Sequence, residues 1–176
     1  FPGFTDPWEQ RKFGDLYYVN NERNSDLIPE SKILSVASMT YKENGNGAEA
    51  DSLKNYKVLR LGDLGFEGHT SKDFKYGRFV LNDTGLGIMS PRFSSLRPIH
   101  NGDLSFWKQY IHYEPIMRSK LVNSTKAGTM MKELVPKDLL SQTILVPSLE
   151  EQNKIGTMFN QVEILIALHR RNFVVH

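Results

Sequence analysis

The sequence predicts an α+β protein with a β-rich body, a few short helices and a long C-terminal helix of the coiled-coil type. The first half contains short runs of β-branched and aromatic residues separated by polar turns. Helix signals begin after residue 102, and the last stretch is one uninterrupted helical pattern. We therefore expect two units, a body over residues 1–147 and a helix over residues 148–176.

Five strands are expected in the first part of the body, over residues 16–19, 33–39, 56–61, 78–81 and 87–89. Residues 42–55 contain two Asn-Gly pairs and are expected to form a loop without a packed element. The glycine-rich residues 62–68 are interpreted as a bend between strands, because they match neither a P-loop nor a dinucleotide-binding loop.

Two short helices and one strand are expected in the rest of the body. Asp103 is predicted to cap a helix that ends before Pro115. The apolar face of this helix consists of Leu104, Trp107, Tyr110 and Ile111. A second helix is predicted to begin near Pro136, and residues 143–146 are predicted to be a strand that closes onto the sheet.

The last helix begins at a capping box, with Ser148 as the cap and Glu151 three residues later. Apolar residues then recur at steps of three and four, the pattern of a coiled-coil seam. The residues predicted to pair with another helix are Ile155, Met158, Phe159, Val162, Leu165, Ile166 and His169. The alternative is a helix folded back on its own domain. Against it, Glu163 is the only charged residue between Lys154 and Arg170.

The composition is that of a globular chain and excludes several kinds of protein. No apolar run approaches the roughly 18 residues of a membrane span, and the first residues lack the layout of a signal peptide. The chain has no cysteine, which excludes disulfides, thiol catalysis and cysteine-bound zinc. We therefore expect a cytoplasmic protein that does not associate with membranes.

The formal net charge of +2 is unevenly distributed. Residues 67–137 carry eleven Lys and Arg against six Asp and Glu, a net charge of +5. The segments before and after it carry net charges of −2 and −1. Such a basic middle is either a solvated face or a surface for an anionic partner.

No complete catalytic motif is present. His112 and Glu114 match the H-x-E of zinc deaminases, but the cysteines of that site are missing. The sequence contains neither the HExxH of zinc proteases nor a Gly-x-Ser-x-Gly nucleophile motif. A small metal-dependent DNA-acting enzyme stays open as an alternative, with a magnesium site built from Asp63 or Asp73, Glu67 and Lys72.

Several loops of the body are rich in residues that hydrogen-bond phosphates and base edges. The candidates for DNA binding are Lys42, Asn44, Asn46, His69, Thr70, Ser71, Lys72, Arg78, Ser90, Arg92, Lys126, Gly128, Thr129 and Lys132. The alternative is that these loops are only solvated, in a protein-interaction adaptor that binds its partner through the helix.

Several stretches of the chain resemble the specificity (S) subunits of type I restriction-modification enzymes. They are FPGFTDPWEQRKFGDL at the start, YKVLRLGDLGF and MSPRF in the middle, then AGTMMKELVPKDLLSQTILVPS, and LEEQNKIGTMFNQVEILIALHRR at the end. The resemblance spans essentially the whole chain. Its most specific part is the run in which a strand ends in Pro and enters L-E-E-Q-x-K-I-G as a long helix.

This resemblance implies a non-catalytic protein that binds double-stranded DNA sequence-specifically and holds no cofactor of its own. Members of the family carry two target-recognition domains, each followed by a long helix, and the two helices pack antiparallel. Each domain reads one half of a split target. The subunit docks methyltransferase (M) subunits, which use S-adenosylmethionine to methylate adenine, and through them restriction (R) subunits that use ATP and Mg²⁺.

This chain departs from the family pattern because it has one recognition domain and one helix. We therefore expect a half-subunit or an excised domain, whose helix pairs with a second copy in a homodimer or with another recognition half. The pair Gly128-Thr129 matches the small residues that the family has at this place. His169 is either a polar seam residue or part of a frayed end. Core or domain-to-helix packing, rather than stacking on bases, is expected for Trp8, Phe106 and Trp107.

Overall fold

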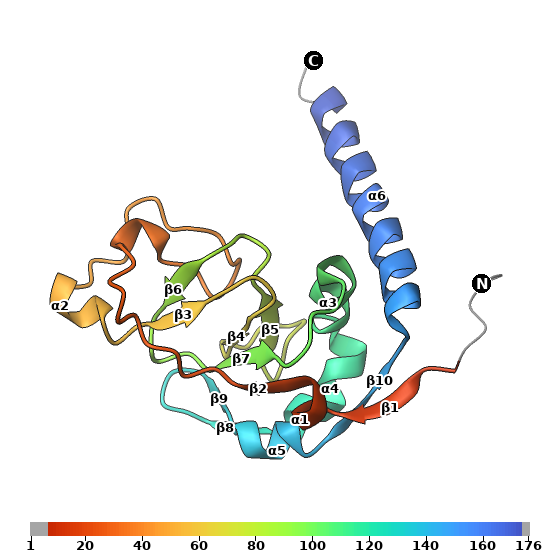
Figure 1. The fold of residues 1–176 in the computed structure, drawn as a ribbon, viewed down its shortest axis with the longest axis horizontal. Coiled ribbons are helices and arrows are strands. Elements are labelled where there is room, and N and C mark those ends of the chain that lie inside the picture. Colours follow the sequence, from red (N-terminus) through yellow and green to blue (C-terminus); the bar gives the residue numbers. More distant parts are fainter. Residues whose placement is uncertain (1–6, 174–176) are drawn as a thin grey trace.

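Small antiparallel sheets make up the body of the protein, and one long helix projects from it (Figure 1). The computed structural model describes residues 7–173. Within them it has ten short strands, arranged as one sheet of four strands and three sheets of two. The expected α+β class, with a β-rich body, short helices and a long C-terminal helix, is confirmed.

The four-stranded sheet carries the main core. Its strands lie in the order β2 (Tyr17–Val19), β7 (Ser95–Pro98), β4 (Leu64–Glu67) and β5 (Arg78–Leu81). β5 matches its prediction, and β2 lacks only the predicted first residue. β7 was not expected, because Ser, Arg and Pro are weak strand formers. Pairing with β2 on one side and β4 on the other holds it in the sheet.

The interpretation of residues 62–68 as a bend is wrong for most of the segment. The chain turns at Leu61 and Gly62, where Gly62 has a φ of +88° and the Asp63 N–H donates to the Arg60 carbonyl (3.0 Å). β4 then continues with all four of its residues buried. Gly65 lies close to the side chains of Met39 and Met89, so a side chain there would require the Met39 methyl group to move. Gly65 therefore allows close packing in a central strand, whereas Gly62 forms the turn before it.

A smaller lobe lies beside the main sheet (Figure 1). It is formed by β3 (Lys57–Leu59), β6 (Gly87–Met89), the 3₁₀ turn η1 (Glu30–Lys32) and helix α2 (Ala50–Leu53). β6 matches its prediction, whereas β3 is shorter than the predicted residues 56–61 because the chain turns at Leu61, which is exposed. α2 corrects the expectation of an unpacked loop over residues 42–55, since Leu53 is buried in one core cluster with Val58.

The predicted strand over residues 33–39 does not form. Ile33 and Leu34 make only isolated bridges, after which the chain turns and the Met39 N–H donates to the Ser35 carbonyl (2.7 Å). Met39 has a φ of +51°, outside the strand region. The apolar side chains of this segment fill two small core clusters, so they are buried without alternating along a sheet.

Helix α3 (Leu104–Tyr110) begins as predicted, with the Asp103 carboxylate accepting from the Phe106 N–H at 2.8 Å. Helix α5 (Pro136–Leu140) also begins at the predicted residue. Helix α4 (Glu114–Val122) was not expected. Pro115 lies in the first turn of α4, where no intrahelical hydrogen bond is lost. This proline therefore comes after the end of α3, as expected, and also belongs to the start of the next helix. A hairpin of β8 (Thr125–Ala127) and β9 (Lys132–Leu134) separates α4 from α5.

The two ends of the body meet at the base of the long helix. The predicted strand over residues 143–146 forms as β10 (Thr143–Val146), but it pairs with β1 (Glu9–Lys12) rather than closing onto the main sheet. Helix α1 (Phe13–Leu16) connects β1 to β2. The expectation about the sheet failed because β1, which has no apolar residue, carried no strand signal.

Helix α6 (Leu149–Phe173) is fixed at its base by two tryptophans. The Trp8 indole N–H donates to the Glu151 carboxylate (2.8 Å), and the Trp107 indole N–H donates to the Gln152 side-chain oxygen (3.1 Å). The capping box is half formed, since the Ser148 hydroxyl accepts from the Glu151 N–H but the Glu151 carboxylate binds Trp8. These contacts confirm the expected packing role of the tryptophans, and Phe106 is buried with them.

Beyond its first turn, α6 packs on the body mainly through α3. The outermost of these contacts are side-chain hydrogen bonds from Ser105 to Asn160 (2.9 Å) and from Gln109 to Glu163 (3.0 Å). The start of α6 is thus held on the body as far as Glu163. The division into a body over residues 1–147 and a helix over residues 148–176 as separate units remains a prediction. Among the described residues, no helix is long and apolar enough to cross a bilayer.

Candidate nucleic-acid interface

Three of the four candidate loops meet at one edge of the body. The turn after β4 lies against the β8–β9 hairpin, where the Lys132 N–H donates to the Gly68 carbonyl at 2.9 Å. A side chain at Gly68 would collide with the Lys132 carbonyl, so this approach needs glycine. The loop after β6 reaches the same hairpin, with the Arg92 guanidinium 4.0 Å from the Met130 sulfur. We call the loops over residues 68–72, 90–92 and 126–132 the convergent loops.

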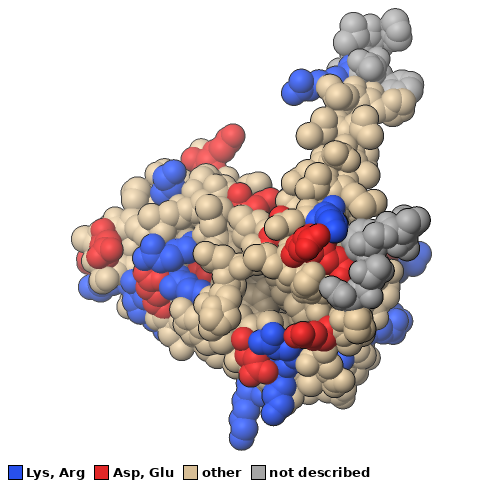
Figure 2. All heavy atoms as spheres, turned by 45° about the vertical axis from the view of Figure 1, so that its right-hand side comes forward, with Lys and Arg blue, Asp and Glu red and all other residues tan. Residues whose placement is uncertain are grey.

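Most candidate side chains on the convergent loops are exposed. The exposed residues are His69, Thr70, Ser71, Lys72, Arg92, Lys126 and Thr129, while Ser90, Gly128 and Lys132 are half-buried. Lys126 forms an ion pair with Glu133 of the hairpin (3.4 Å). On the face of the body that Figure 2 shows, basic and acidic side chains are interleaved and form no continuous basic patch. Such a surface favours binding through separate polar contacts.

Arg78 lies beside the convergent loops, at the start of β5. Its guanidinium is 5.0 Å from the centre of the Phe74 ring, and one terminal nitrogen donates to the Ala37 carbonyl at 3.3 Å. The Nε atom is buried without a hydrogen-bond partner. Because Nε is buried, only the terminal nitrogens of the Arg78 guanidinium are candidates for contact with a ligand.

The fourth candidate loop, which contains Lys42, Asn44 and Asn46, lies in the smaller lobe. Its backbone is held by a hydrogen bond from the Lys42 N–H to the Ile33 carbonyl (2.9 Å). The Asn46 side-chain amide donates to the Tyr56 hydroxyl at 2.8 Å. Within the described residues, these contacts run to the smaller lobe and not to the convergent loops. The sequence could not show this separation, because it depends on the path of the chain.

Asp63, one of the acidic residues proposed for a magnesium site, has other partners. Asp63 is buried and accepts a two-pronged hydrogen bond from Arg97 (2.9 and 2.7 Å) and another from the Arg60 N–H (2.8 Å). Glu22 completes the network and binds both arginines; the hydrogen bond from Arg60, followed by that from Arg97, lowers the pKa of Glu22. The described residues contain no group of three or more His, Cys, Asp or Glu that could hold a metal ion. Asp63 therefore ties β4 to β7.

The apolar seam of α6 is largely uncovered. Met158, Phe159, Val162, Leu165 and Ile166 have between 39% and 65% of their surface exposed. Ile155, at the start of the seam, is half-buried against the main core, and His169 lies toward the exposed end of the helix. On the side of α6 that Figure 2 shows, the middle of the helix carries no charged side chain. A helix folded back along its whole length is therefore excluded for the described residues.

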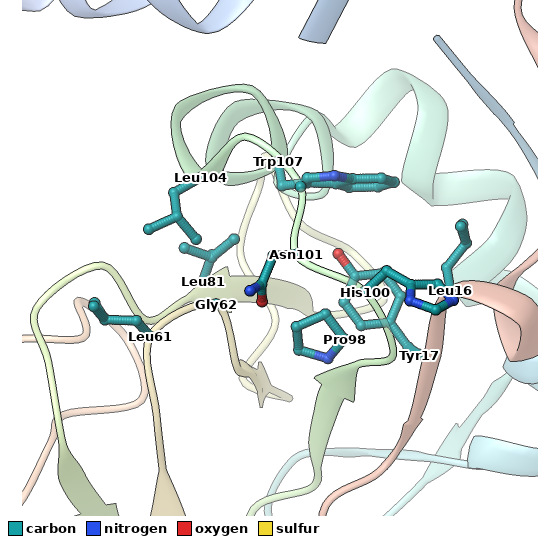
Figure 3. A pocket seen from close by; sticks show the side chains of 11 residues that line it. Leu16, Tyr17, Leu61, Gly62, Leu81, Pro98, His100, Asn101, Leu104 and Trp107 are labelled. Carbon is teal, nitrogen blue, oxygen red and sulfur yellow. The ribbon is translucent and has the colours of Figure 1, made fainter. Parts of the chain in front are cut away.

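A hollow of about 350 Å³ lies between the main sheet and α3. Figure 3 shows Trp107 and Leu104 of α3 on one side, Tyr17 and Pro98 of the sheet on the other, and Asn101 between them. The walls are mainly apolar, and burial raises the pKa of Tyr17 above its ordinary value. The sequence had no signal for this hollow, because its walls come from four separate segments of the chain.

The family of the chain follows from a comparison over nearly its whole length. Residues 5–172 match the family model described as the type I restriction modification DNA specificity domain. The chain belongs to this family. The resemblance seen in the sequence is thereby confirmed, and the family consists of recognition subunits rather than catalytic ones. A search of the curated proteins found no match.

Solved structures of such subunits share the fold. The HsdS subunit from Thermoanaerobacter tengcongensis superposes with a TM-score of 0.54 at 20% identity, over 97% of this chain and 41% of that chain. A structure described as showing complex assembly and conformational transition of the type I R-M system gives a TM-score of 0.56 at 17% identity, over 97% and 42%. This specificity domain therefore spans about two fifths of the length of these two chains.

Proposed function

We propose that this specificity domain reads one half of a split double-stranded DNA target for a type I restriction-modification complex. The observation that carries the proposal is the separation of two surfaces within a member of this family. The convergent loops offer hydrogen-bonding groups on the body, and the seam of α6 offers an apolar face on a helix that leaves the body. The first surface suits DNA, and the second suits another helix.

The convergent loops are suited to contact DNA directly. Lys72, Arg92 and Lys132 supply cations for phosphates, and Thr70, Ser71 and Thr129 supply hydroxyl groups. Arg78, at the start of β5, adds the terminal nitrogens of its guanidinium. Lys42, Asn44 and Asn46 would form a second contact region on the smaller lobe. Binding through several phosphate contacts should weaken steeply as salt increases.

The seam of α6 is suited to an antiparallel partner helix. A two-fold axis at Val162 would place Ile155 opposite His169 of a second copy, and Phe159 opposite Leu165. The first turn of α6 is acidic and the last turn is basic. An antiparallel arrangement brings these opposite charges together and keeps the two bodies apart. The partner is a second copy of this chain or another recognition half.

The paired helices would set the distance between the two half-sites. α6 has 25 residues, which corresponds to about 37 Å at about 1.5 Å per residue. One turn of DNA is about 34–36 Å long. A pair of this length would place the two bodies about one helical turn apart on the same side of the duplex.

The chemistry of the complex would reside in other subunits. We propose that methyltransferase and restriction subunits bind S-adenosylmethionine, ATP and Mg²⁺, and that this domain binds no cofactor and works in the cytoplasm. A helix-mediated adaptor without DNA binding is the second candidate, favoured by the interleaved charges of the body.

Selection from a pool of random duplex DNA tests the proposal, with the purified chain as the binding protein. The expected result is a two-part sequence with a fixed gap, together with a dimer mass in light scattering if the chain pairs with itself. Failure to enrich any sequence, with salt-independent absence of binding, would favour the adaptor. Metal-dependent cleavage of the selected DNA by the purified chain would favour an enzyme.

A further inference from the structure

We propose that His69 reads a base as a hydrogen-bond acceptor, and that Glu67 holds it in that state. The group recognised would be an exocyclic amino group in the major groove, which is N6 of adenine or N4 of cytosine. The inference rests on the proposed function and deepens it, because it assigns a chemical preference to one residue of the recognition surface.

The starting point is a buried carboxylate at the end of a central strand. Glu67 is the last residue of β4, and its side chain is only 9% exposed. One oxygen, Oε1, accepts from the His69 backbone N–H at 2.9 Å and lies 2.5 Å from His69 Nδ1. An ionised carboxylate can only accept hydrogen bonds, and a buried one needs donors. The ring nitrogen Nδ1 must therefore carry a hydrogen.

In the neutral ring, which the proposal requires, this fixes the role of the other ring nitrogen. A neutral imidazole has one N–H, so a hydrogen on Nδ1 leaves Nε2 as an acceptor with a free lone pair. The His69 side chain is 56% exposed, so the ring edge that does not face Glu67 is open to a ligand. A neutral acceptor cannot donate to phosphate oxygens, to guanine O6 and N7, or to thymine O4. Among the groups on duplex DNA, it pairs with the amino groups.

The position of His69 on the body supports contact with a base rather than with solvent alone. The preceding residue, Gly68, is joined to Lys132 of the β8–β9 hairpin (2.9 Å), so His69 sits where the convergent loops meet. Lys72 of the same loop and Lys132 of the adjoining hairpin can bind phosphates. Such contacts set the register of a base-reading side chain. The four base pairs place their amino groups at different points of the major groove, so one fixed acceptor distinguishes between them.

The first experiment measures the state of His69 in the free protein. Nitrogen-15 NMR of the intact chain at neutral pH should show Nδ1 as the protonated nitrogen of His69 and Nε2 as the unprotonated one. In Glu67→Gln this preference should weaken, because an amide can donate to the ring as well as accept from it. A hydrogen on Nε2 in the wild-type protein, in either the other tautomer or the doubly protonated ring, would overturn the proposal.

The second experiment removes the amino groups of the selected DNA site one at a time. Purine replaces adenine, and 2-pyrimidinone replaces cytosine, so each analogue lacks only the amino group. At one base pair the wild-type chain should lose about tenfold in affinity, as for one hydrogen bond lost at an interface. His69→Ala should bind the normal and the modified duplex equally at this position and keep its preferences elsewhere. His100→Ala, which removes an exposed histidine outside the convergent loops, is the matched control and should keep the tenfold loss.

The outcomes separate this inference from the proposed function. If the wild-type chain selects a sequence but His69→Ala keeps every amino-group dependence, His69 is not the reader, while DNA recognition stands. If no sequence is selected at all, the proposed function fails and the inference fails with it. A uniform loss of affinity for His69→Ala on every duplex would indicate a phosphate contact and would also overturn the inference.

Discussion

Two charges placed on the seam of α6 should separate a paired protein into single chains. The change is Val162→Asp together with Ile166→Asp. Both residues are exposed on α6, at 51% and 46%, and lie one turn apart near the middle of the seam. Ile155 is a poorer choice, because it also packs on the main core.

The size of the effect follows from the exposed surface. Full burial of a Val or Ile side chain contributes about 1.5–3 kcal/mol, so covering the exposed half of each contributes about 1 kcal/mol. A two-fold pair contains four such side chains, which gives about 4 kcal/mol, or about a thousandfold in the dimer dissociation constant. Four carboxylates at the seam would add repulsion and a cost of desolvation. A thousandfold is therefore the minimum expected change.

Sedimentation velocity over a concentration series measures this change, and circular dichroism checks that the body stays folded. The matched control places the same two charges on the opposite side of the helix, as Ile164→Asp with Leu168→Asp. These residues are 59% and 52% exposed and lie about 120–160° around the helix from the seam pair, at about 3.6 residues per turn. The control should pair like the wild-type chain.

Three results would refute the reasoning. A seam variant that stays fully dimeric would show that pairing does not use this face. Equal dissociation of the control would show that added charge, rather than the seam, decides the outcome. A wild-type chain that is monomeric at every concentration would refute pairing with its own copy and favour a different recognition half as the partner.

Three further predictions concern the body. Asp63→Asn should lower the free energy of unfolding by about 1.5–3 kcal/mol in urea titrations, because the partly buried Arg97 guanidinium loses one of its two carboxylate partners and keeps only Glu22; an unchanged midpoint would contradict this. Lys132→Ala should reduce the slope of log affinity against log salt by about one without changing the selected sequence, as expected for a phosphate contact. Acid should destabilise the fold in part through Glu22, whose pKa is lowered by Arg60, so the stability it contributes is present above its unfolded pKa and is lost as pH falls through the lower folded pKa. Glu22→Gln should show a smaller loss of thermal stability over that acidic range than the wild-type chain.

Features that depend on neighbouring residues could be predicted from the sequence. The caps at Asp103 and Ser148 formed because a side-chain oxygen reaches an N–H only three residues away. The seam of α6 is a periodic pattern, and periodicity is a local property. β5 and β6 formed as predicted because each is a short run of strand-forming residues bounded by turns.

Features that depend on distant partners were decided only by the tertiary structure. β7 is a strand because β2 and β4 pair with it, and residues 33–39 are not a strand because their side chains fill two separate clusters. The candidate residues were found by type, but whether they share a surface depends on the chain path. Lys132 meets the turn after β4 through the Gly68 carbonyl, whereas Asn46 is held in the smaller lobe. Sequence identifies which side chains can bind DNA, and long-range packing decides which of them lie together.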